Sequence, residues 1–408
     1  MSLERWRRLP GLPWPAWPAW PAWVGLLATL VGSYAALAAF GVPEDLGVYR
    51  EAAAAALSGA DVLYAGPVDR LPYTYPPVAA YLLAPVAWWP PVLGGVLMTT
   101  VNVAVLWRLT CLFLPRRALG GSGRPRYAVA AALLPLARLL EPVWQTFSFG
   151  QVNLVLAWLV AEDLLGRWSG RSGRWRGVLL GLAVLVKLTP GIFALVLLFR
   201  RDWASLARTG LVVLAGVAVG FVLLPRSSAQ FWTSALRDPA RVGGVEFAAN
   251  QSLNGALWRA LGPGGSPAAW LLLVLVTLAT TAYILIRRGR VGEGPLAAGR
   301  DPGVVLAAAL AGLLMSPVSW SHHWVWVWPL LLWLLWLVGS TGARVLAIGW
   351  AAAAYGWVIW WFPHQAGREY DVGPLGLLLT DAYVVLGLAT LVWLAVRSRS
   401  PVLGRRRP

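Results

Sequence analysis

Apolar runs long enough to cross a lipid bilayer recur along the chain, and arginine-rich segments separate many of them. A spanning helix needs about 20 apolar residues, and in lipid only helices and closed barrels pair all their backbone groups. The runs predict an all-α integral membrane protein with about twelve membrane segments. The segments are Val24–Phe40, Pro76–Trp107, Tyr127–Leu140, Phe147–Leu165, Gly177–Leu188, Gly191–Phe199, Gly210–Leu224, Ala268–Ile286, Gly303–Pro317, Trp324–Val338, Arg344–Phe362 and Leu375–Val396.

The charge content supports this class. Only 12% of the residues are charged, and the formal net charge is +17, whereas soluble chains carry about 25% charged residues. The deficit excludes an ordinary cytosolic enzyme. The positive charges are mostly arginines at the ends of apolar runs, where they set topology and contact anionic lipid headgroups. We therefore expect membrane lipids as partners and no nucleic acid.

Arginine clusters orient the chain, because positively charged loops stay on the cytoplasmic side. All clusters fall on one side if Gly177–Phe199 enters and leaves the membrane from the cytoplasm as a hairpin. This predicts a bacterial plasma-membrane protein with cytoplasmic termini and two long outer loops, 42–75 between segments 1 and 2 and 225–267 between segments 7 and 8. The expected parts are a basic, Trp/Pro-rich lead-in (1–23), a single transmembrane domain (24–396) and a basic cytoplasmic tail (397–408).

Two carboxylates, Glu44 and Asp45, follow the first span directly. A partly desolvated carboxylate has a raised proton affinity, so Asp45 is a candidate general base. Acidic residues also stabilise helix starts, and a helix is expected here over Arg50–Leu57. The local pattern leaves both interpretations open.

Lys187 is the only lysine in the chain and lies between two apolar stretches too short to span comfortably. A charge within a membrane segment is costly and by default indicates function, and an ammonium is a good phosphate binder. Snorkelling of Lys187 to the interface is the alternative. Arg259, in the second long loop, is a second candidate for phosphate, or else part of an amphipathic helix.

His322 and His323 lie between two predicted spans, where an imidazole can bind phosphate or donate a proton, or can simply belong to the interface. Adjacent histidines point differently on a helix, and Cys111 is the only cysteine. We therefore expect no metal, no disulfide within the chain and no cofactor. The last outer loop, with His364, Arg368, Glu369 and Asp371, is expected to be solvated.

Six short motifs occur in an order that resembles one family. The chain resembles the bacterial polyprenol-phosphate-mannose-dependent α-(1→2)-mannosyltransferases, a GT-C-type family of membrane glycosyltransferases (family 87). The motifs are Asp45-x-x-Val48-Tyr49, Tyr75-Pro76-Pro77, Gly150-Gln151-x-Asn153, Lys187-x-Thr189-Pro190, Asn250-Gln251-Ser252 and Ser316-Pro317-x-Ser319-Trp320-x-His322-His323.

The resemblance implies an inverting transfer on the outer face, from a polyprenyl-phosphate-sugar donor to a glycolipid or lipoglycan acceptor. Asp45 matches the first-loop aspartate that deprotonates the acceptor hydroxyl. Lys187, His322 and His323, with Arg259, are expected near the donor phosphate. Sugar or acceptor contacts are expected from Tyr49, Tyr75, Gln151, Asn153, Asn250, Gln251 and Trp320.

Other functions stay open from the sequence. Related enzymes transfer arabinofuranose or other lipid-linked sugars, and a lipid or sugar transporter would also be polytopic. A transporter would more often show internal repeats with paired broken helices. Only one broken hairpin, around Lys187, is evident in the sequence, which favours the enzyme over a transporter or a non-catalytic scaffold.

Overall fold

The computed structural model describes residues 20–64, 71–114, 123–166, 173–289, 301–338 and 340–398. The described residues are helical, with one isolated β-bridge, Asn250 to Trp320. The expected basic tail lies almost wholly outside them, as do the first 19 residues of the lead-in. The first elements are α2 (Trp20–Phe40), α3 (Glu44–Leu57), α4 (Pro77–Leu82), α5 (Ala84–Ala87), α6 (Pro91–Phe113), α7 (Gly123–Ala132), α8 (Leu134–Leu139), α9 (Glu141–Phe149), α10 (Asn153–Leu164) and α11 (Val178–Val186).

The second part of the chain continues with shorter and more irregular elements. These are η2 (Thr189–Phe193), α12 (Ala194–Phe199), α13 (Trp203–Leu223), α14 (Pro225–Thr233), η3 (Ala235–Arg237), η4 (Pro239–Val242), α15 (Leu253–Leu261), α16 (Pro267–Gly289), α17 (Pro302–Met315), η6 (Ser321–Trp326), α18 (Val327–Leu332), η7 (Trp333–Val338), α19 (Thr341–Tyr355), η8 (Val358–Trp360), η9 (Arg368–Tyr370), α20 (Pro374–Thr380) and α21 (Ala382–Arg397).

Four described helices, α2, α6, α13 and α16, are long and apolar enough to cross a membrane. Two helix pairs bent by more than 40° raise the number to six if each pair is one span. The membrane class is therefore supported, while the other predicted segments appear as shorter pieces. The break expected at Pro90-Pro91 is present, since α4 and α5 precede a continuous α6. Proline starts helices readily but interrupts their interiors.

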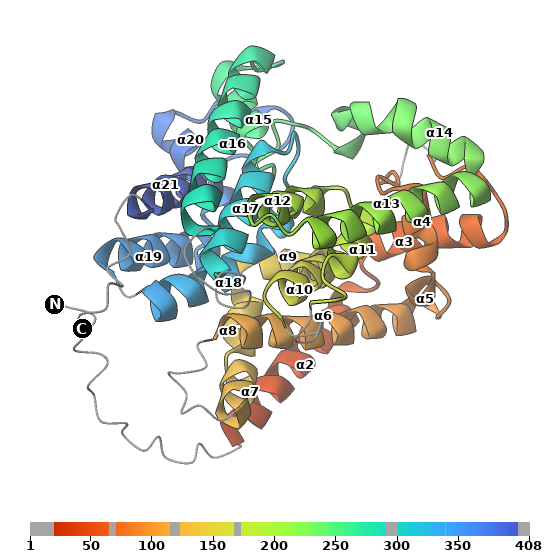
Figure 1. The fold of residues 1–408 in the computed structure, drawn as a ribbon, viewed down its shortest axis with the longest axis horizontal. Coiled ribbons are helices and arrows are strands. Elements are labelled where there is room, and N and C mark those ends of the chain that lie inside the picture. The colour runs from red at the N-terminus through yellow and green to blue at the C-terminus, as the bar shows by residue number, and fades with distance from the viewer. Residues whose placement is uncertain are drawn as a thin grey trace.

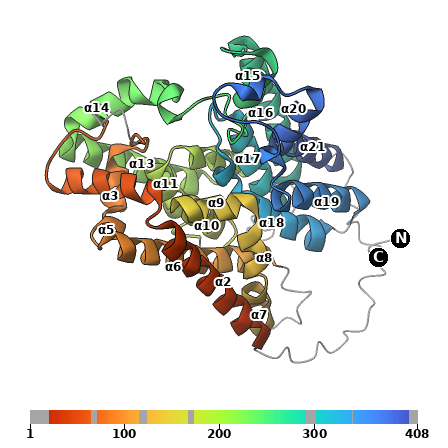
Figure 2. The same cartoon turned by 180° about the vertical axis from the view of Figure 1, so that it is seen from behind.

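The helices form an irregular bundle in which α10 and α17 lie near the middle (Figure 1). Helix α10 packs on α6 and α11, α9 packs on η6, and α17 packs on α16, α21 and η2. Helices α2 and α7 pack together at the lower edge, and α14 lies at the opposite corner, as the reverse view also shows (Figure 2). Residues from both halves of the chain thus meet at the centre.

Two acidic residues are buried, and for one of them the prediction is wrong. Residues Glu141–Thr146 form the first two turns of α9, and Glu141 is fully buried. Pro142 favours that helix start, and three donors satisfy the Glu141 carboxylate, which permits its burial. Glu369, expected to be solvated, is also buried and accepts a hydrogen bond from the Gln365 backbone N–H.

Candidate active site

Asp45 lies in the first turn of α3, which begins at Glu44, earlier than the helix start expected at Arg50. Its carboxylate Oδ2 accepts a hydrogen bond of 2.8 Å from the side-chain amide of Gln151. Gly150, with φ 66°, ends α9 in a left-handed conformation, and a Cβ there would lie 2.8 Å from Pro43 Cβ. A glycine is therefore needed for α9 to end this close to the start of α3.

The other end of the Gln151 amide joins two tyrosines. Its Oε1 accepts from the hydroxyls of Tyr49 and Tyr75 at 2.9 and 3.1 Å, and the two hydroxyls lie 2.8 Å apart. Both rings are buried and meet edge to face. Tyr49, Tyr75 and Gln151, expected as sugar contacts, therefore form a buried network that holds the Asp45 carboxylate.

Lys187 lies where α11 ends and η2 begins, with φ −151° and ψ 134°. This extended residue breaks the helix just before Pro190 and directs the side chain toward η6. Its Nζ lies 2.8 Å from His323 Nε2 and 5.5 Å from the centroid of the Tyr75 ring. The ammonium therefore contacts both the Asp45 network and the histidine pair.

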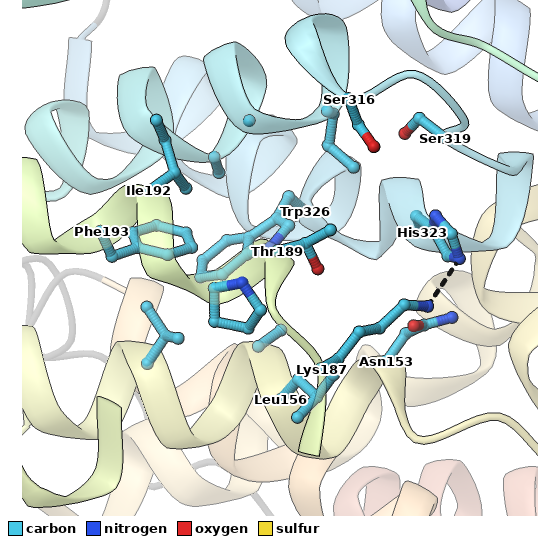
Figure 3. Close-up of a pocket in the computed structure, with 16 residues that line it drawn as sticks. Asn153, Leu156, Lys187, Thr189, Ile192, Phe193, Ser316, Ser319, His323 and Trp326 are labelled. Atoms are coloured by element: carbon cyan, nitrogen blue, oxygen red, sulfur yellow. Dashed lines mark hydrogen bonds between the residues drawn. The ribbon is translucent and has the colours of Figure 1, made fainter. Parts of the chain in front are cut away.

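A cavity opens beside this cluster (Figure 3). At one end Lys187 and His323 face each other, with Asn153, Thr189, Ser316 and Ser319 around them. The other end is apolar, and its lining includes Leu156, Val160, Ile192, Phe193, Leu313 and Trp326. A cavity with a cationic polar end and an apolar wall suits an amphiphile with an anionic head.

The side chains of His322 and His323 have different surroundings. His323 lines the cavity, whereas the His322 ring packs edge to face on Phe149. The His322 backbone carbonyl accepts hydrogen bonds from Thr146 Oγ1 and Asn153 Nδ2, both at 3.0 Å. These bonds hold η6 against α9 and α10, so that His323 is directed at Lys187.

The charge on Asp45 is set by opposing effects. Burial raises its pKa to about 6, although the Gln151 hydrogen bond and the Lys187 charge both favour the carboxylate. A carboxyl group with this pKa is ionised at neutral pH and retains substantial basicity. It is suited to accept a proton from a hydroxyl group.

This pKa predicts an acid limb in the pH–rate profile. Only the ionised carboxylate can accept a proton, so protonation below pH about 6 removes the active form. We expect kcat/KM for sugar transfer to fall about tenfold per pH unit below this value and to level off above it. A profile that is flat between pH 5 and 8 would show that Asp45 does not act as the base.

Comparison with known proteins identifies the family of this chain. The model of glycosyltransferase family 87 matches residues 73–317, which include Tyr75, Gln151 and Lys187. The chain belongs to glycosyltransferase family 87. Asp45 and His323 lie outside the matched range, and the contacts described above connect them to it. No solved structure matches this chain.

Three relatives of this family 87 glycosyltransferase are similar to it over most of its length. A polyprenol-phosphate-mannose-dependent alpha-(1-2)-phosphatidylinositol mannoside mannosyltransferase of Mycobacterium tuberculosis is 36% identical over 78% of this chain and 76% of its own. The enzyme of the same name from Mycolicibacterium smegmatis is 37% identical over 70% and 68%. A corresponding phosphatidylinositol pentamannoside mannosyltransferase of M. smegmatis is 34% identical over 86% and 84%.

The second long loop of the family 87 enzyme is held by its own polar residues. Asn250 donates to the Val245 carbonyl and accepts from the Ser319 N–H, while Gln251 donates to the carbonyls of Ala248 and Thr380. Both side chains were expected as sugar contacts. Asn250 instead fastens the loop to the segment before η6, and Gln251 fastens it to the end of α20. Trp320 bridges to Asn250 through the backbone, and its ring packs on Phe247.

Arg259 has a full set of internal partners. Its guanidinium bonds the Asp381 carboxylate and the backbone carbonyls of Glu246, Phe247 and Asn250. It is buried and does not line the cavity that Lys187 and His323 share. The structure therefore corrects the expectation that Arg259 binds the donor phosphate: its five N–H donors are already used.

Breaking this pair tests its structural role. We expect Arg259→Leu to lower the free energy of unfolding by about 3–5 kcal/mol, because it leaves Asp381 as a buried charge without its partner. Thermal denaturation of the detergent-purified protein measures the loss, and the exposed Arg237 provides Arg237→Leu as the matched control. An unchanged melting temperature with a raised KM for the donor would instead place Arg259 at the phosphate.

Glu141 is a residue of the site region that the sequence analysis missed. Its carboxylate accepts hydrogen bonds from Ser321 Oγ at 2.7 Å, Trp360 Nε1 at 3.0 Å and Tyr383 OH at 2.9 Å. Ser321 immediately precedes the histidine pair, so Glu141 anchors η6 to η8 and α21. A carboxylate in an apolar run, at the predicted membrane boundary, was the available signal.

Proposed function

We propose that this family 87 enzyme transfers mannose from a polyprenyl-phosphate-mannose donor to a phosphatidylinositol-mannoside-type glycolipid on the outer face of the plasma membrane. The activities of its relatives supply the donor and acceptor classes. The observation that carries the proposal for this chain is one cluster that joins a base, Asp45, to the Lys187 ammonium, which lies against the His323 imidazole.

In the proposed reaction, Asp45 accepts the proton of the acceptor hydroxyl as its oxygen forms a bond to C1 of mannose. The bond from C1 to the donor phosphate oxygen breaks, and that oxygen keeps the electron pair. A single displacement of this kind inverts the configuration at C1. Lys187, with His323 beside it, stabilises the charge on the departing polyprenyl phosphate. Asp45 later returns its proton to solvent.

The cavity supports the donor half of this proposal. Its cationic end would hold the phosphate, and its apolar wall would take the first isoprene units, as its lining suggests. Asn153, Thr189 and Ser319 offer hydrogen-bonding groups for the sugar hydroxyls at the same end. Trp320 and the loop around Asn250 and Gln251 would then frame the entrance without contacting the phosphate.

The proposed topology has about twelve segments, cytoplasmic termini and the cluster facing outward. The shorter helices would form the remaining segments inside the bundle. There, neighbouring helices can supply hydrogen-bond partners for the backbone groups at their ends. Cysteine labelling at the exposed Glu44 tests the orientation in intact cells. Labelling by an impermeant reagent is expected, and protection from it would place Asp45 on the cytoplasmic side.

A donor comparison tests the function itself. Membranes containing the wild-type protein are incubated with polyprenyl-phosphate-mannose or polyprenyl-phosphate-arabinofuranose, each with the sugar radiolabelled. We expect label in glycolipid from the mannose donor alone. If label is transferred from the arabinofuranose donor instead, the sugar is arabinofuranose and not mannose. If neither sugar is transferred but the labelled lipid moves across the bilayer, a transporter is favoured.

A further inference from the structure

Arg200 ends α12 and is not among the residues that line the cavity. Residue 201 follows with φ 57°, and Asp202 then caps α13 by accepting from the Ser205 N–H. Helix α12 packs on α13, α16 and α17, so Arg200 lies where these helices have their ends. Its charged neighbours are Asp301, Arg176 and Asp202.

The guanidinium of Arg200 is buried without a partner. Within the described chain, none of its three nitrogens has a hydrogen-bond partner, and each is shielded from solvent. Arg176 Nε is also buried and has no hydrogen-bond partner within the described chain. Leaving a charged donor both buried and unpaired is costly, and a guanidinium fork is suited to two oxygens of one anion.

The nearby carboxylates are already engaged by other groups. Asp202 accepts from Ser205 and lies 3.4 Å from Arg176 Nη1. Asp301 is paired with Arg288 at 2.8 Å and accepts from the Gly303 N–H. Three arginines thus share two aspartates, so the junction carries an excess positive charge that an anion would neutralise.

The level of this junction in the membrane identifies the kind of anion. Helix α13 begins at Trp203 and α16 ends at Gly289, and both are candidate spans. The start of one span and the end of another mark a membrane surface, and the Trp203 side chain is 58% exposed there. Lipid phosphates lie at this level and are the most abundant anions available.

We propose that Arg200, with Arg176, binds the phosphate group of an anionic phospholipid at this surface. The site is distinct from the Lys187 cavity, because Arg200 does not line it and η2 and α12 separate Arg200 from Lys187 along the chain. The bound phosphate would tie α12, and through it the Lys187 segment, to the ends of α13 and α16. This inference does not depend on the sugar, donor or acceptor proposed above.

Two neighbouring arginines provide a matched test. Arg200→Gln and Arg201→Gln remove the same charge one residue apart, but Arg201 is exposed. The detergent-purified proteins are titrated with phosphatidylglycerol, and bound lipid is counted by native mass spectrometry. Phosphatidylcholine is the lipid control, and inorganic phosphate is the control for a free anion.

We expect Arg200→Gln to weaken phosphatidylglycerol binding about tenfold or more, and Arg201→Gln to leave it close to wild type. If both variants lose phosphatidylglycerol binding equally, the lipid responds to general surface charge, and a specific site at Arg200 is ruled out. If millimolar inorganic phosphate competes for the site and phosphatidylglycerol is not preferred over phosphatidylcholine, the bound anion is free phosphate, which would contradict the proposal of a lipid.

If Arg200→Gln does not fold, Arg200→Lys keeps the charge and removes the fork. We then expect weakened lipid binding with an unchanged yield of protein, because a point charge cannot reproduce two-oxygen contact. Unaltered lipid binding in Arg200→Lys would contradict the assignment. Sugar transfer is measured in parallel as a separate readout and does not decide the result.

Discussion

Replacing Asp45 with asparagine is expected to reduce kcat for mannose transfer by about 10²–10⁴-fold, because an amide cannot accept the proton of the acceptor hydroxyl. Asparagine keeps the size of the side chain and an oxygen that can accept from Gln151, so the network around Tyr49 should persist. The measurement is transfer of radiolabelled mannose from polyprenyl-phosphate-mannose to membrane glycolipid.

The neighbouring carboxylate serves as the control for this variant. Glu44 is exposed and belongs to the same helical turn as Asp45. Glu44→Gln should therefore retain most of the wild-type kcat. If Asp45→Asn remains active while Glu44→Gln loses activity, the base is Glu44. Equal expression and equal melting temperatures are required for either conclusion.

Replacing Lys187 with methionine is the second variant with a large expected effect. Methionine retains the length and apolar stem of lysine but removes the charge that stabilises the departing phosphate. We expect kcat to fall about 10²–10³-fold. The Lys187 charge also lowers the pKa of Asp45, so the acid limb of the remaining activity should move to higher pH.

A double variant distinguishes a joint role from two separate ones. Lys187 and His323 are in direct contact at 2.8 Å, and groups that act as a unit show non-additive kinetic effects. Lys187→Met combined with His323→Gln should cost little more than Lys187→Met alone. Fully multiplicative losses would mean that the two residues act on different steps or different groups.

Several elements of the structure could be predicted from local sequence. The apolar runs indicated a helical membrane protein, because an unpaired backbone is not tolerated in lipid. Lys187 was identified as a candidate since a lone charge in such a run is costly without a purpose. Asp45 was identified by its place after the first span, although the sequence left its role as base or helix cap open.

Other features depended on contacts between distant segments. The sequence did not indicate that Gln151, 106 residues from Asp45, donates to its carboxylate. It grouped Arg259 with the phosphate ligands, whereas the partner that occupies its guanidinium, Asp381, lies 122 residues away. Burial of Glu369 was missed because it lies in a short polar stretch that resembles a loop. Burial of Glu141 was missed because the three donors that satisfy it come from distant segments.

The sequence by itself determined the class of the protein and the residue types available for glycosyl transfer. These follow from hydropathy and from the cost of charge in an apolar run, which are properties of short segments. Only the tertiary structure decided which polar groups face the cavity and which are used to hold loops together. That division depends on which donors and acceptors meet across the bundle, since a buried polar group must be paired wherever its partner lies in the chain.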